Sequence, residues 1–323
     1  MLFRRTFAAA LAASGCAALG WTAAAQELKT VAVTAIIEHP ALDAARNGIR
    51  DELAAAGYEE GHNLDLLFES AGGNPTAAAQ IARRFALEAP DVIVAISTPS
   101  AQAVASATRE IPVVFSAVTD PVGARLVPNL ERPGGNVTGI SDLSPIGLHL
   151  DLIREIAPGT RRLGVIYNPG EPNAVALVGL IRQEAPARNL EILETVATRS
   201  AAVPDAAQSL IGDVDAIYVP TDNTVAAALE AVIEVGTGHR LPVFAGDTNA
   251  VPRGAIAALG FNYYDLGRQT GKIVLRVLAG ANPGDIPVEG VQLTELYVNP
   301  GAAAAMGVTI PPAMLQRAKV VVE

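Results

Sequence analysis

A regular alternation of short apolar segments with longer segments of helical spacing is the feature that most constrains the fold of this chain. The uninterrupted apolar runs at residues 92–96 and 111–115 have the length and composition of buried strands. Residues 42–56 carry apolar side chains at helical spacing. Strands that are apolar on both faces are typical of parallel sheets covered by helices on both sides. The sequence therefore predicts an α/β fold of doubly wound parallel sheets.

Two series of this alternation follow one another, over about residues 28–140 and 145–260. A predicted helix at 265–278 and a predicted strand at 293–298 are surplus to the second series. The economical interpretation is that the chain crosses more than once between two lobes, which form a hinge with a ligand between them. We therefore expect an amino-terminal lobe of residues 26–142 plus 262–285. The carboxy-terminal lobe is expected to comprise residues 143–261 plus 286–323.

The first 25 residues have the pattern of an export signal. Arg4 and Arg5 precede a run of small and apolar residues, and Ala25 ends a small-residue cleavage site. The apolar run is shorter than the roughly 20 residues of a membrane span. We expect cleavage after Ala25 and a periplasmic protein. Two other interpretations stay open, a lipid anchor through Cys16 and a twin-arginine signal.

Charge and cysteine content argue against several classes of protein. Lys and Arg number 23 against 33 Asp and Glu, a net charge of −10, and the missing basic patch argues against nucleic acids and anionic membranes as partners. A single cysteine excludes a disulfide framework and a cysteine metal site. The phosphate-binding loop, the nucleophile elbow and the dinucleotide fingerprint are also missing. We therefore expect a binding protein without catalytic residues, metal or cofactor.

Polar residues follow most of the predicted strands, at the edge where parallel α/β sheets bind ligands. Thr98 and Ser100 begin a helix after strand 92–96, where hydroxyls and free amide groups suit a carboxylate. Asp120, after strand 111–115, suits an ammonium group. The other strand-end candidates are His39, Asn168, Asp222, Asn223 and Asp247. Helix caps and turns would explain each of these residues singly, so both interpretations stay open.

Several segments together resemble the substrate-binding proteins of ABC transporters that have the type I periplasmic binding fold. They are residues 39–43 (HPALD), 97–102 (STPSAQ), 111–115 (IPVVF), 118–122 (VTDPV), 133–139 (PGGNVTG), 219–223 (VPTDN) and 254–267, followed by Gly280 and Pro287. The combination of TDPV with PGGNVTG makes the resemblance specific. It covers about residues 29–312 and is closest to the branch whose better-known members bind tryptophan or tyrosine.

The resemblance implies two lobes that close on a ligand and then dock on a membrane permease. The residues that it places at the cleft are Thr98, Ser100, Thr119, Asp120, Asp222 and Asp247, with Ser141 and Tyr264 near the hinge. In this interpretation the hydroxyls bind a carboxylate, an aspartate binds an ammonium group, and Tyr264 or His39 packs on an apolar side chain. We expect a monomeric receptor of an ABC importer for a small molecule, an amino acid. The alternative is an exported sensory module that feeds a signalling partner.

Overall fold

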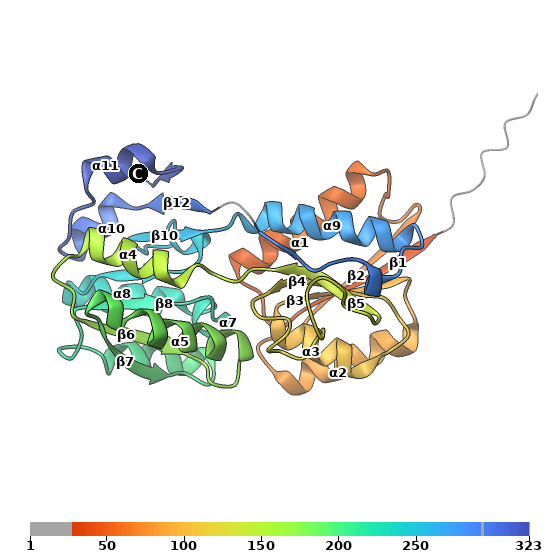
Figure 1. The fold of residues 1–323 in the computed structure, drawn as a ribbon, viewed down its shortest axis with the longest axis horizontal. Coiled ribbons are helices and arrows are strands. Elements are labelled where there is room, and N and C mark those ends of the chain that lie inside the picture. Colours follow the sequence, from red (N-terminus) through yellow and green to blue (C-terminus); the bar gives the residue numbers. More distant parts are fainter. Residues whose placement is uncertain (1–27, 292–293, 323) are drawn as a thin grey trace, which may run out of the picture.

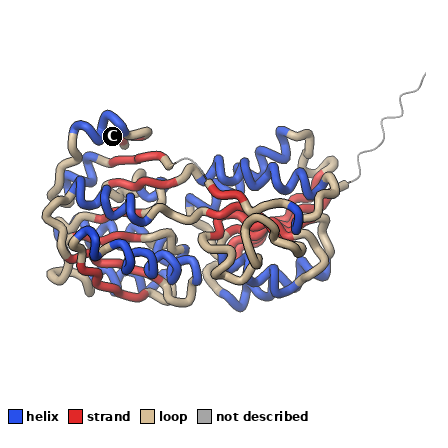
Figure 2. The backbone as a smooth tube through the Cα atoms, viewed as in Figure 1, coloured by secondary structure: helices blue, strands red, loops and turns tan. Residues whose placement is uncertain are grey.

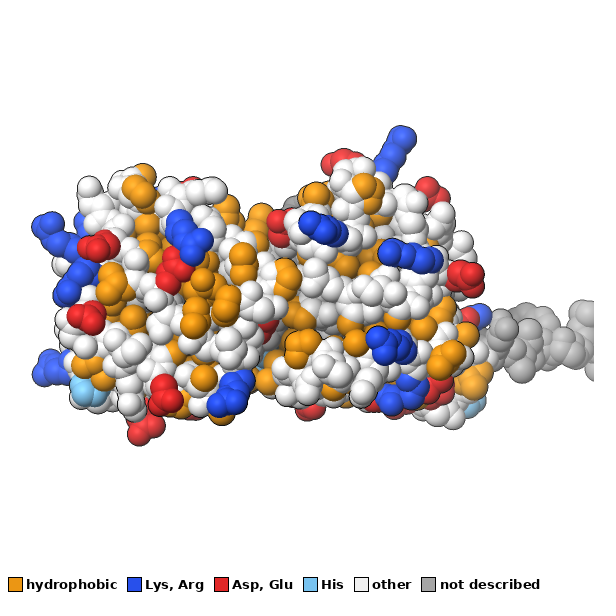
Figure 3. All heavy atoms as spheres, turned by 90° about the horizontal axis from the view of Figure 1, so that it is seen from below, with side chains coloured by type: hydrophobic (Ala, Val, Ile, Leu, Met, Phe, Trp, Pro, Cys, Tyr) orange, Lys and Arg blue, Asp and Glu red, His pale blue; other side chains and the backbone are white. Residues whose placement is uncertain are grey.

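The computed structural model describes residues 28–291 and 294–322 and consists of two α/β lobes that lie end to end (Figure 1). Figure 3 shows the indentation between the lobes on one face of the molecule. The predicted export signal, Cys16 included, lies outside the described residues. Among the helices of the described part, none is long and apolar enough to cross a membrane.

The first lobe is built on a six-stranded sheet in the order β11-β5-β4-β3-β1-β2, in which every neighbouring pair is parallel. Its strands are β1 (Lys29–Ala35), β2 (Leu64–Ser70), β3 (Val92–Ile96), β4 (Val113–Val118), β5 (Val137–Ser141) and β11 (Glu289–Gly290). Its helices are α1 (Pro40–Ala55), α2 (Pro75–Glu88), α3 (Thr98–Ala107) and α9 (Tyr263–Leu278). Helices α1 and α9 cover one face of the sheet, and α2 and α3 cover the other (Figure 1).

The second lobe has a parallel sheet in the order β7-β6-β8-β9 and a smaller sheet in the order β10-β12-β13. Its strands are β6 (Arg162–Tyr167), β7 (Glu191–Val196), β8 (Ala216–Val219), β9 (Val243–Ala245), β10 (Ala257–Gly260), β12 (Glu295–Val298) and β13 (Val320–Val321). Its helices are α4 (Ile146–Ile156), α5 (Pro172–Glu184), α6 (Val203–Gln208), α7 (Asn223–Ala226), α8 (Leu229–His239), α10 (Pro300–Ala305) and α11 (Pro312–Arg317). The predicted α/β fold of parallel sheets is confirmed, with an antiparallel β10–β12 pair added to it.

Helix starts follow from local chemistry. Helices α1, α2 and α5 each begin with a proline, whose missing N–H is not needed in the first turn. Asn74 caps α2 by accepting hydrogen bonds from the backbone N–H groups of Thr76 and Ala77. Asn262 caps α9 in the same way.

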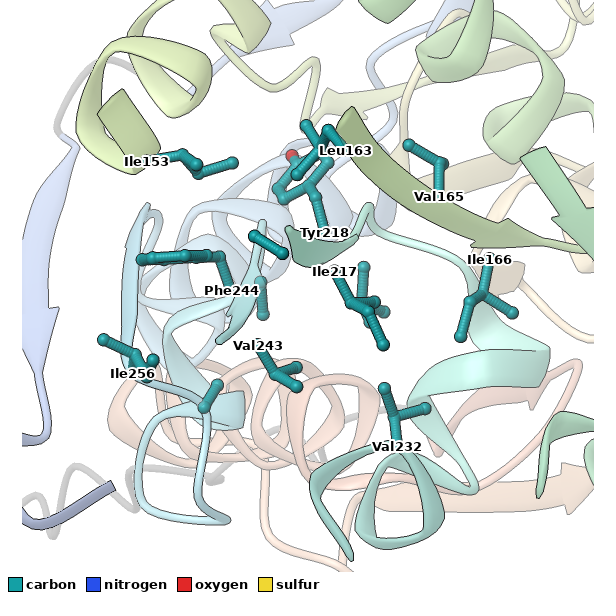
Figure 4. Packing of buried hydrophobic residues seen from close by; sticks show 14 of the residues in the cluster. Ile153, Leu163, Val165, Ile166, Ile217, Tyr218, Val232, Val243, Phe244 and Ile256 are labelled. Atoms are coloured by element: carbon teal, nitrogen blue, oxygen red, sulfur yellow. The ribbon is translucent and has the colours of Figure 1, made fainter. Parts of the chain in front are cut away.

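The core of the second lobe shows why its strands are apolar on both faces. Ile217 and Tyr218 are neighbours on β8, and both are buried. Figure 4 shows Ile153 of α4 and Val232 of α8 on opposite sides of the parallel sheet. Because successive side chains of a strand point to opposite faces, each face meets a helix layer and must be apolar.

Residues 142–145 after β5 and residues 261–262 after β10 join the lobes (Figure 2). The chain crosses a third time between β11 and β12, which belong to different sheets. The predicted lobe boundary at residue 285 is too early. Glu289 and Gly290 of β11 pair with Ile140 and Ser141 of β5, so the chain stays on the first sheet until residue 290. Two residues of strand pairing carry too weak a sequence pattern to be recognised.

Helix α9 returns to the first lobe by packing closely against α1. A Cβ added at Gly267 of α9 would collide with the backbone of Ala45 in α1. A Cβ added at Gly48 of α1 would collide with the backbone of Tyr264 and Arg268 in α9. Glycine at both positions therefore allows the two backbones to approach more closely than side chains would permit.

Replacing Gly267 with alanine is expected to lower the free energy of unfolding by about 1–3 kcal/mol, because overpacking forces the helices apart. The matched control is Gly179→Ala in α5, where no atom lies within 4 Å of an added Cβ. That control should be neutral or stabilising by roughly 0.5–1 kcal/mol. Urea unfolding measures both variants, and equal effects would contradict the close helix contact.

Candidate functional site

A cavity lies between the lobes, where the strands of both parallel sheets end. Its position at the carboxyl ends of the strands is typical of ligand sites in parallel α/β sheets. The first lobe and its hinge contribute His39, Ala41, Leu42, Ala117, Thr119, Asp142 and Tyr263. The second lobe contributes Asn173, residues 219–223, Ala226, Leu229, Ala245, Asp247, Ala250 and Arg253. A ligand in the cavity would therefore touch both lobes.

Two carboxylates of the cavity come from different parts of the fold. Asp142 lies in the first connection, and its two oxygens accept hydrogen bonds from Thr119 Oγ1 (3.1 Å) and Tyr263 OH (2.8 Å). Asp247 follows β9, and its Oδ1 accepts from the backbone N–H of Asn249 (2.8 Å) and from Asn249 Nδ2 (3.1 Å). Burial raises the pKa of both carboxyls, and the charge of Asp247 raises the pKa of Asp142 further. A cation in the cavity would oppose both effects.

A third carboxylate, Glu171, is 5% exposed and sits at the start of α5. Five donor groups surround it: Asn173 Nδ2, the backbone N–H and Nδ2 of Asn223, and the backbone N–H and Oγ1 of Thr224. Both of its oxygens are used in these contacts. Glu171 is thus a structural acceptor that holds the start of α7.

Asp222 is buried beside Glu171 and caps α7. Its oxygens accept from the backbone N–H groups of Asn168 (2.6 Å) and Val225 (2.8 Å). Burial and the neighbouring Glu171 carboxylate raise the pKa of Asp222 to about 8. Since its oxygens already have partners, Asp222 serves the fold as well as the cavity wall.

His39 reaches across the gap between the lobes. Its Nε2 lies 3.4 Å from Oδ1 of Asn223 in the second lobe. Burial lowers the pKa of His39 to about 4, so the imidazole is neutral at neutral pH. Its Nδ1 is buried and has no hydrogen-bond partner among the described residues.

The start of α3 holds a group of buried hydroxyls. The side chains of Ser97, Thr98 and Ser100 are at most 2% exposed, and their oxygens have no partner within residues 28–291 and 294–322. Ser97 has a φ of 82° and leaves the first turn of the helix without a side-chain cap. The backbone N–H of Ser97 donates to Ser116 O, which places this turn beside the end of β4. Unused donors at a helix start suit a carboxylate.

The structure brings together five of the predicted site residues on the cavity wall: His39, Thr119, Asp222, Asn223 and Asp247. Thr98 and Ser100 lie at the α3 start and not on that wall. Asn168 lies behind the wall, where its Nδ2 donates to Thr224 Oγ1. Ser141 is also behind it, with its Oγ donating to the backbone oxygen of Thr119.

Two predicted positions face elsewhere. Asp120 accepts a hydrogen bond from the backbone N–H of Gly123 and closes a turn outside the cavity. Tyr264 is 36% exposed, and its hydroxyl donates to Asp51. The preceding residue, Tyr263, is the buried tyrosine of the cavity. Consecutive side chains of a helix point about 100° apart, so a prediction that is wrong by one position selects a surface residue in place of a cavity residue.

Sequence reasoning missed four polar residues at the site: Asp142, Glu171, Asn173 and Tyr263. Glu171 and Asn173 lie in the polar segment after β6, of which the prediction includes only Asn168. Asp142 directly follows Ser141 in the first connection. If every polar residue of a strand-end segment were treated as a candidate, Asp142, Glu171 and Asn173 would be included.

Comparison with known proteins identifies the family of this chain. The family model described as ABC transporter substrate binding protein matches residues 30–322. A curated relative, the tyrosine-binding protein of Clostridioides difficile (strain R20291), is 38% identical over 278 residues, which are 86% of this chain and 81% of the relative. These relatives are substrate-binding proteins and not enzymes.

Two solved structures resemble this one to different degrees. The ABC domain of Streptococcus pneumonia in complex with L-Trp is 32% identical, has a TM-score of 0.88 and covers 92% of this chain and 100% of its own. The ligand-free, open structure of a substrate-binding protein with adhesive properties from Clostridium difficile is 37% identical, with a TM-score of 0.68 over 91% and 99% of the two chains. The less identical protein is the closer in shape.

One of the two structures is described as ligand-free and open, and the other is a complex with L-Trp. Rotation of one lobe against the other lowers the overall similarity even where each lobe is alike. In the present structure, the contact between His39 and Asn223 spans the gap between the lobes. The fold, the inter-lobe cavity and the match over residues 30–322 establish that this chain belongs to the family of ABC transporter substrate-binding proteins.

Proposed function

We propose that the protein is the extracytoplasmic receptor of an ABC importer and that it binds an aromatic amino acid between its lobes. The single observation that carries this proposal is the buried inter-lobe cavity, in which carboxylates face a largely apolar space. The names of the relatives support the ligand class, since one is a tyrosine-binding protein and another was solved with L-Trp.

The ammonium group of the ligand is placed between Asp142 and Asp247. Both carboxylates line the cavity; Asp142 is buried and belongs to the hinge, while Asp247 is partly buried and belongs to the second lobe. A buried carboxylate without a counter-charge is costly, so a cation between the two is favourable. The ammonium group would thus stabilise the closed arrangement of the lobes.

The carboxylate of the ligand is placed toward the start of α3. The hydroxyls of Ser97, Thr98 and Ser100 are buried there without partners among the described residues. The start of a helix also presents free N–H groups and the positive end of the helix dipole. Thr98 and Ser100 lie off the cavity wall in this arrangement, so their role as carboxylate ligands stays a prediction.

The side chain of the ligand is placed against the aliphatic part of the wall. Leu42, Val219, Ala226 and Leu229 line the cavity from both lobes. Aliphatic side chains provide apolar contact to an aromatic ring without requiring a stacking partner. The scarcity of aromatic residues in the chain is therefore compatible with an aromatic ligand.

Removing either charged end of the ligand tests this placement. L-Tyrosine and L-tryptophan should bind to protein that has been unfolded and refolded to strip any ligand. Tyramine lacks the carboxylate, and 3-(4-hydroxyphenyl)propionate lacks the ammonium group. Each analogue should bind at least about 10-fold more weakly, because it leaves buried charged or polar groups without partners. Isothermal titration calorimetry measures the affinities, and preferential binding of a sugar or nucleoside would contradict the proposal.

Replacing Asp247 with asparagine tests the ammonium site. The substitution removes one negative charge at nearly constant size and should weaken binding of the amino acid by about 10-fold or more. Asp120→Asn is the matched control, because Asp120 lies in a turn outside the cavity. Equal affinity of the Asp247→Asn variant and the unchanged protein would place the ammonium group elsewhere.

Small-angle scattering tests closure. The ligand contacts both lobes, so binding should shift the population toward the closed form and reduce the radius of gyration. A radius that is unchanged by a saturating ligand would argue against the closing receptor. Genes for a permease and an ATPase beside this gene would support the importer, whereas a kinase or cyclase gene would favour a sensory module.

A further inference from the structure

Glu171 determines which way two amide side chains point. Its carboxylate accepts hydrogen bonds only, and the Nδ2 atoms of both Asn173 and Asn223 donate to it. Asn173 Nδ2 also donates to the backbone oxygen of Thr221 (3.0 Å). Reversing either amide would bring two oxygens together. Each amide therefore turns its oxygen away from Glu171.

Both oxygens belong to residues that line the cavity between the lobes. Asn173 Oδ1 is buried without a partner in the described chain, and Asn173 lines the cavity. Asn223 Oδ1 lies 3.4 Å from Nε2 of His39 in the opposite lobe. An amide oxygen cannot donate, so Nε2 of His39 must carry the proton of this contact.

The proton on Nε2 determines the hydrogen-bonding role of the other ring nitrogen, Nδ1. A neutral imidazole has one N–H and one acceptor, so Nδ1 of His39 is an acceptor. Burial keeps the ring neutral by lowering its pKa, and nearby Arg253 acts in the same direction. Nδ1 is buried and has no partner among the described residues, and His39 lines the cavity. The cavity thus presents an unused acceptor at this point.

We propose that His39 selects ligands whose side chain carries a hydrogen-bond donor, and that Glu171 acts as a positioning residue through Asn223. The inference rests on the proposed function and adds the basis of its specificity. The donor would be the hydroxyl of tyrosine or the indole N–H of tryptophan, accepted by His39 Nδ1. Phenylalanine and aliphatic amino acids would leave this buried acceptor unpaired.

We assign the ammonium group to Asp142 and Asp247 and not to His39, because a carboxylate attracts a cation and a neutral imidazole beside an arginine does not. Arg253 acts electrostatically on both His39 and Asp247, whereas Asp247 acts on Asp142 and Tyr263. Arg253 is held by a two-point contact with Glu230 through its Nε (2.7 Å) and NH2 (2.8 Å). His39 is therefore assigned the neutral donor of the ligand, and Asp142 and Asp247 are assigned its cation.

Paired ligands that differ only in the donor test the proposal by calorimetry. L-Tyrosine is compared with L-phenylalanine, and L-tryptophan is compared with 3-benzothienyl-L-alanine, in which sulfur replaces the indole N–H. The donor-bearing ligand of at least one pair should bind about 10-fold or more tightly. In the His39→Leu variant, the ratio of the two affinities within each pair should fall to about one, because the acceptor nitrogen is gone. Equal affinities within both pairs in the unchanged protein would overturn the proposal, even if His39→Leu fails to fold.

The tautomer of His39 tests the positioning role without any ligand. Nitrogen-15 NMR of histidine-labelled protein should show His39 protonated at Nε2 and unprotonated at Nδ1. Glu171→Gln can donate as well as accept, so it should release the amide of Asn223, disturb the His39 tautomer and reduce the preference for donor ligands. Glu184→Gln is the matched control on α5, since Glu184 pairs with Arg188 at the surface.

These experiments distinguish a failure of the proposed function from a failure of the specificity role of His39. If none of the four amino acids binds, the proposed function fails, and the specificity role of His39 fails with it. If all bind with equal affinity, the aromatic receptor stands and the role of His39 is wrong. If the ligand preference holds but Glu171→Gln changes neither the tautomer nor the preference, His39 selects the ligand without help from Glu171.

Discussion

The close contact between α1 and α9 is the interaction on which the two-lobed arrangement depends. It returns the chain from the second lobe to the first after β10, and Gly48 and Gly267 make the approach possible. Because α9 belongs to the first lobe, the chain must cross the hinge again to reach β12. The same contact places Tyr263, the first residue of α9, at the cavity beside Asp142. Helix packing and the binding site are therefore coupled.

Buried acidic residues dominate the electrostatics of the site. Burial raises the pKa of Asp142, Asp222 and Asp247, while Glu171 is surrounded by five donors. Carboxylates that lose hydration without gaining a cation are unfavourable, and Asp142 lies in the hinge while Asp247 belongs to the second lobe. In the proposed function, an ammonium group between them would reduce this cost and so link ligand charge to lobe closure.

Some polar residues near the cavity stabilise the fold, and others are available to contact a ligand. Asp222 and Asn168 secure α7 and its neighbouring loop, as helix caps and turns do elsewhere. Their choice as ligand residues from strand-end position alone did not distinguish the two roles. Asp222 also lines the cavity, as does Asp247, which strand-end position indicates as well. Thr119, which the resemblance to the family indicates, lines it too. Position at a strand end is therefore informative about the region of the site and weakly informative about the orientation of a side chain.

The sequence by itself determined the succession of strands and helices along the chain, the parallel sheets and the edge of those sheets at which the site lies. These follow from apolar patterning and from caps, which act between residues close together in the chain. Only the tertiary structure decided that β11 joins the first sheet, that Tyr263 faces the cavity in place of Tyr264, and that Glu171 reaches His39 through Asn223. These three features depend on the rotation of a helix about its axis and on contacts between segments far apart in the chain. Local sequence patterns contain no information about either, because they reflect only interactions between residues close together in the chain.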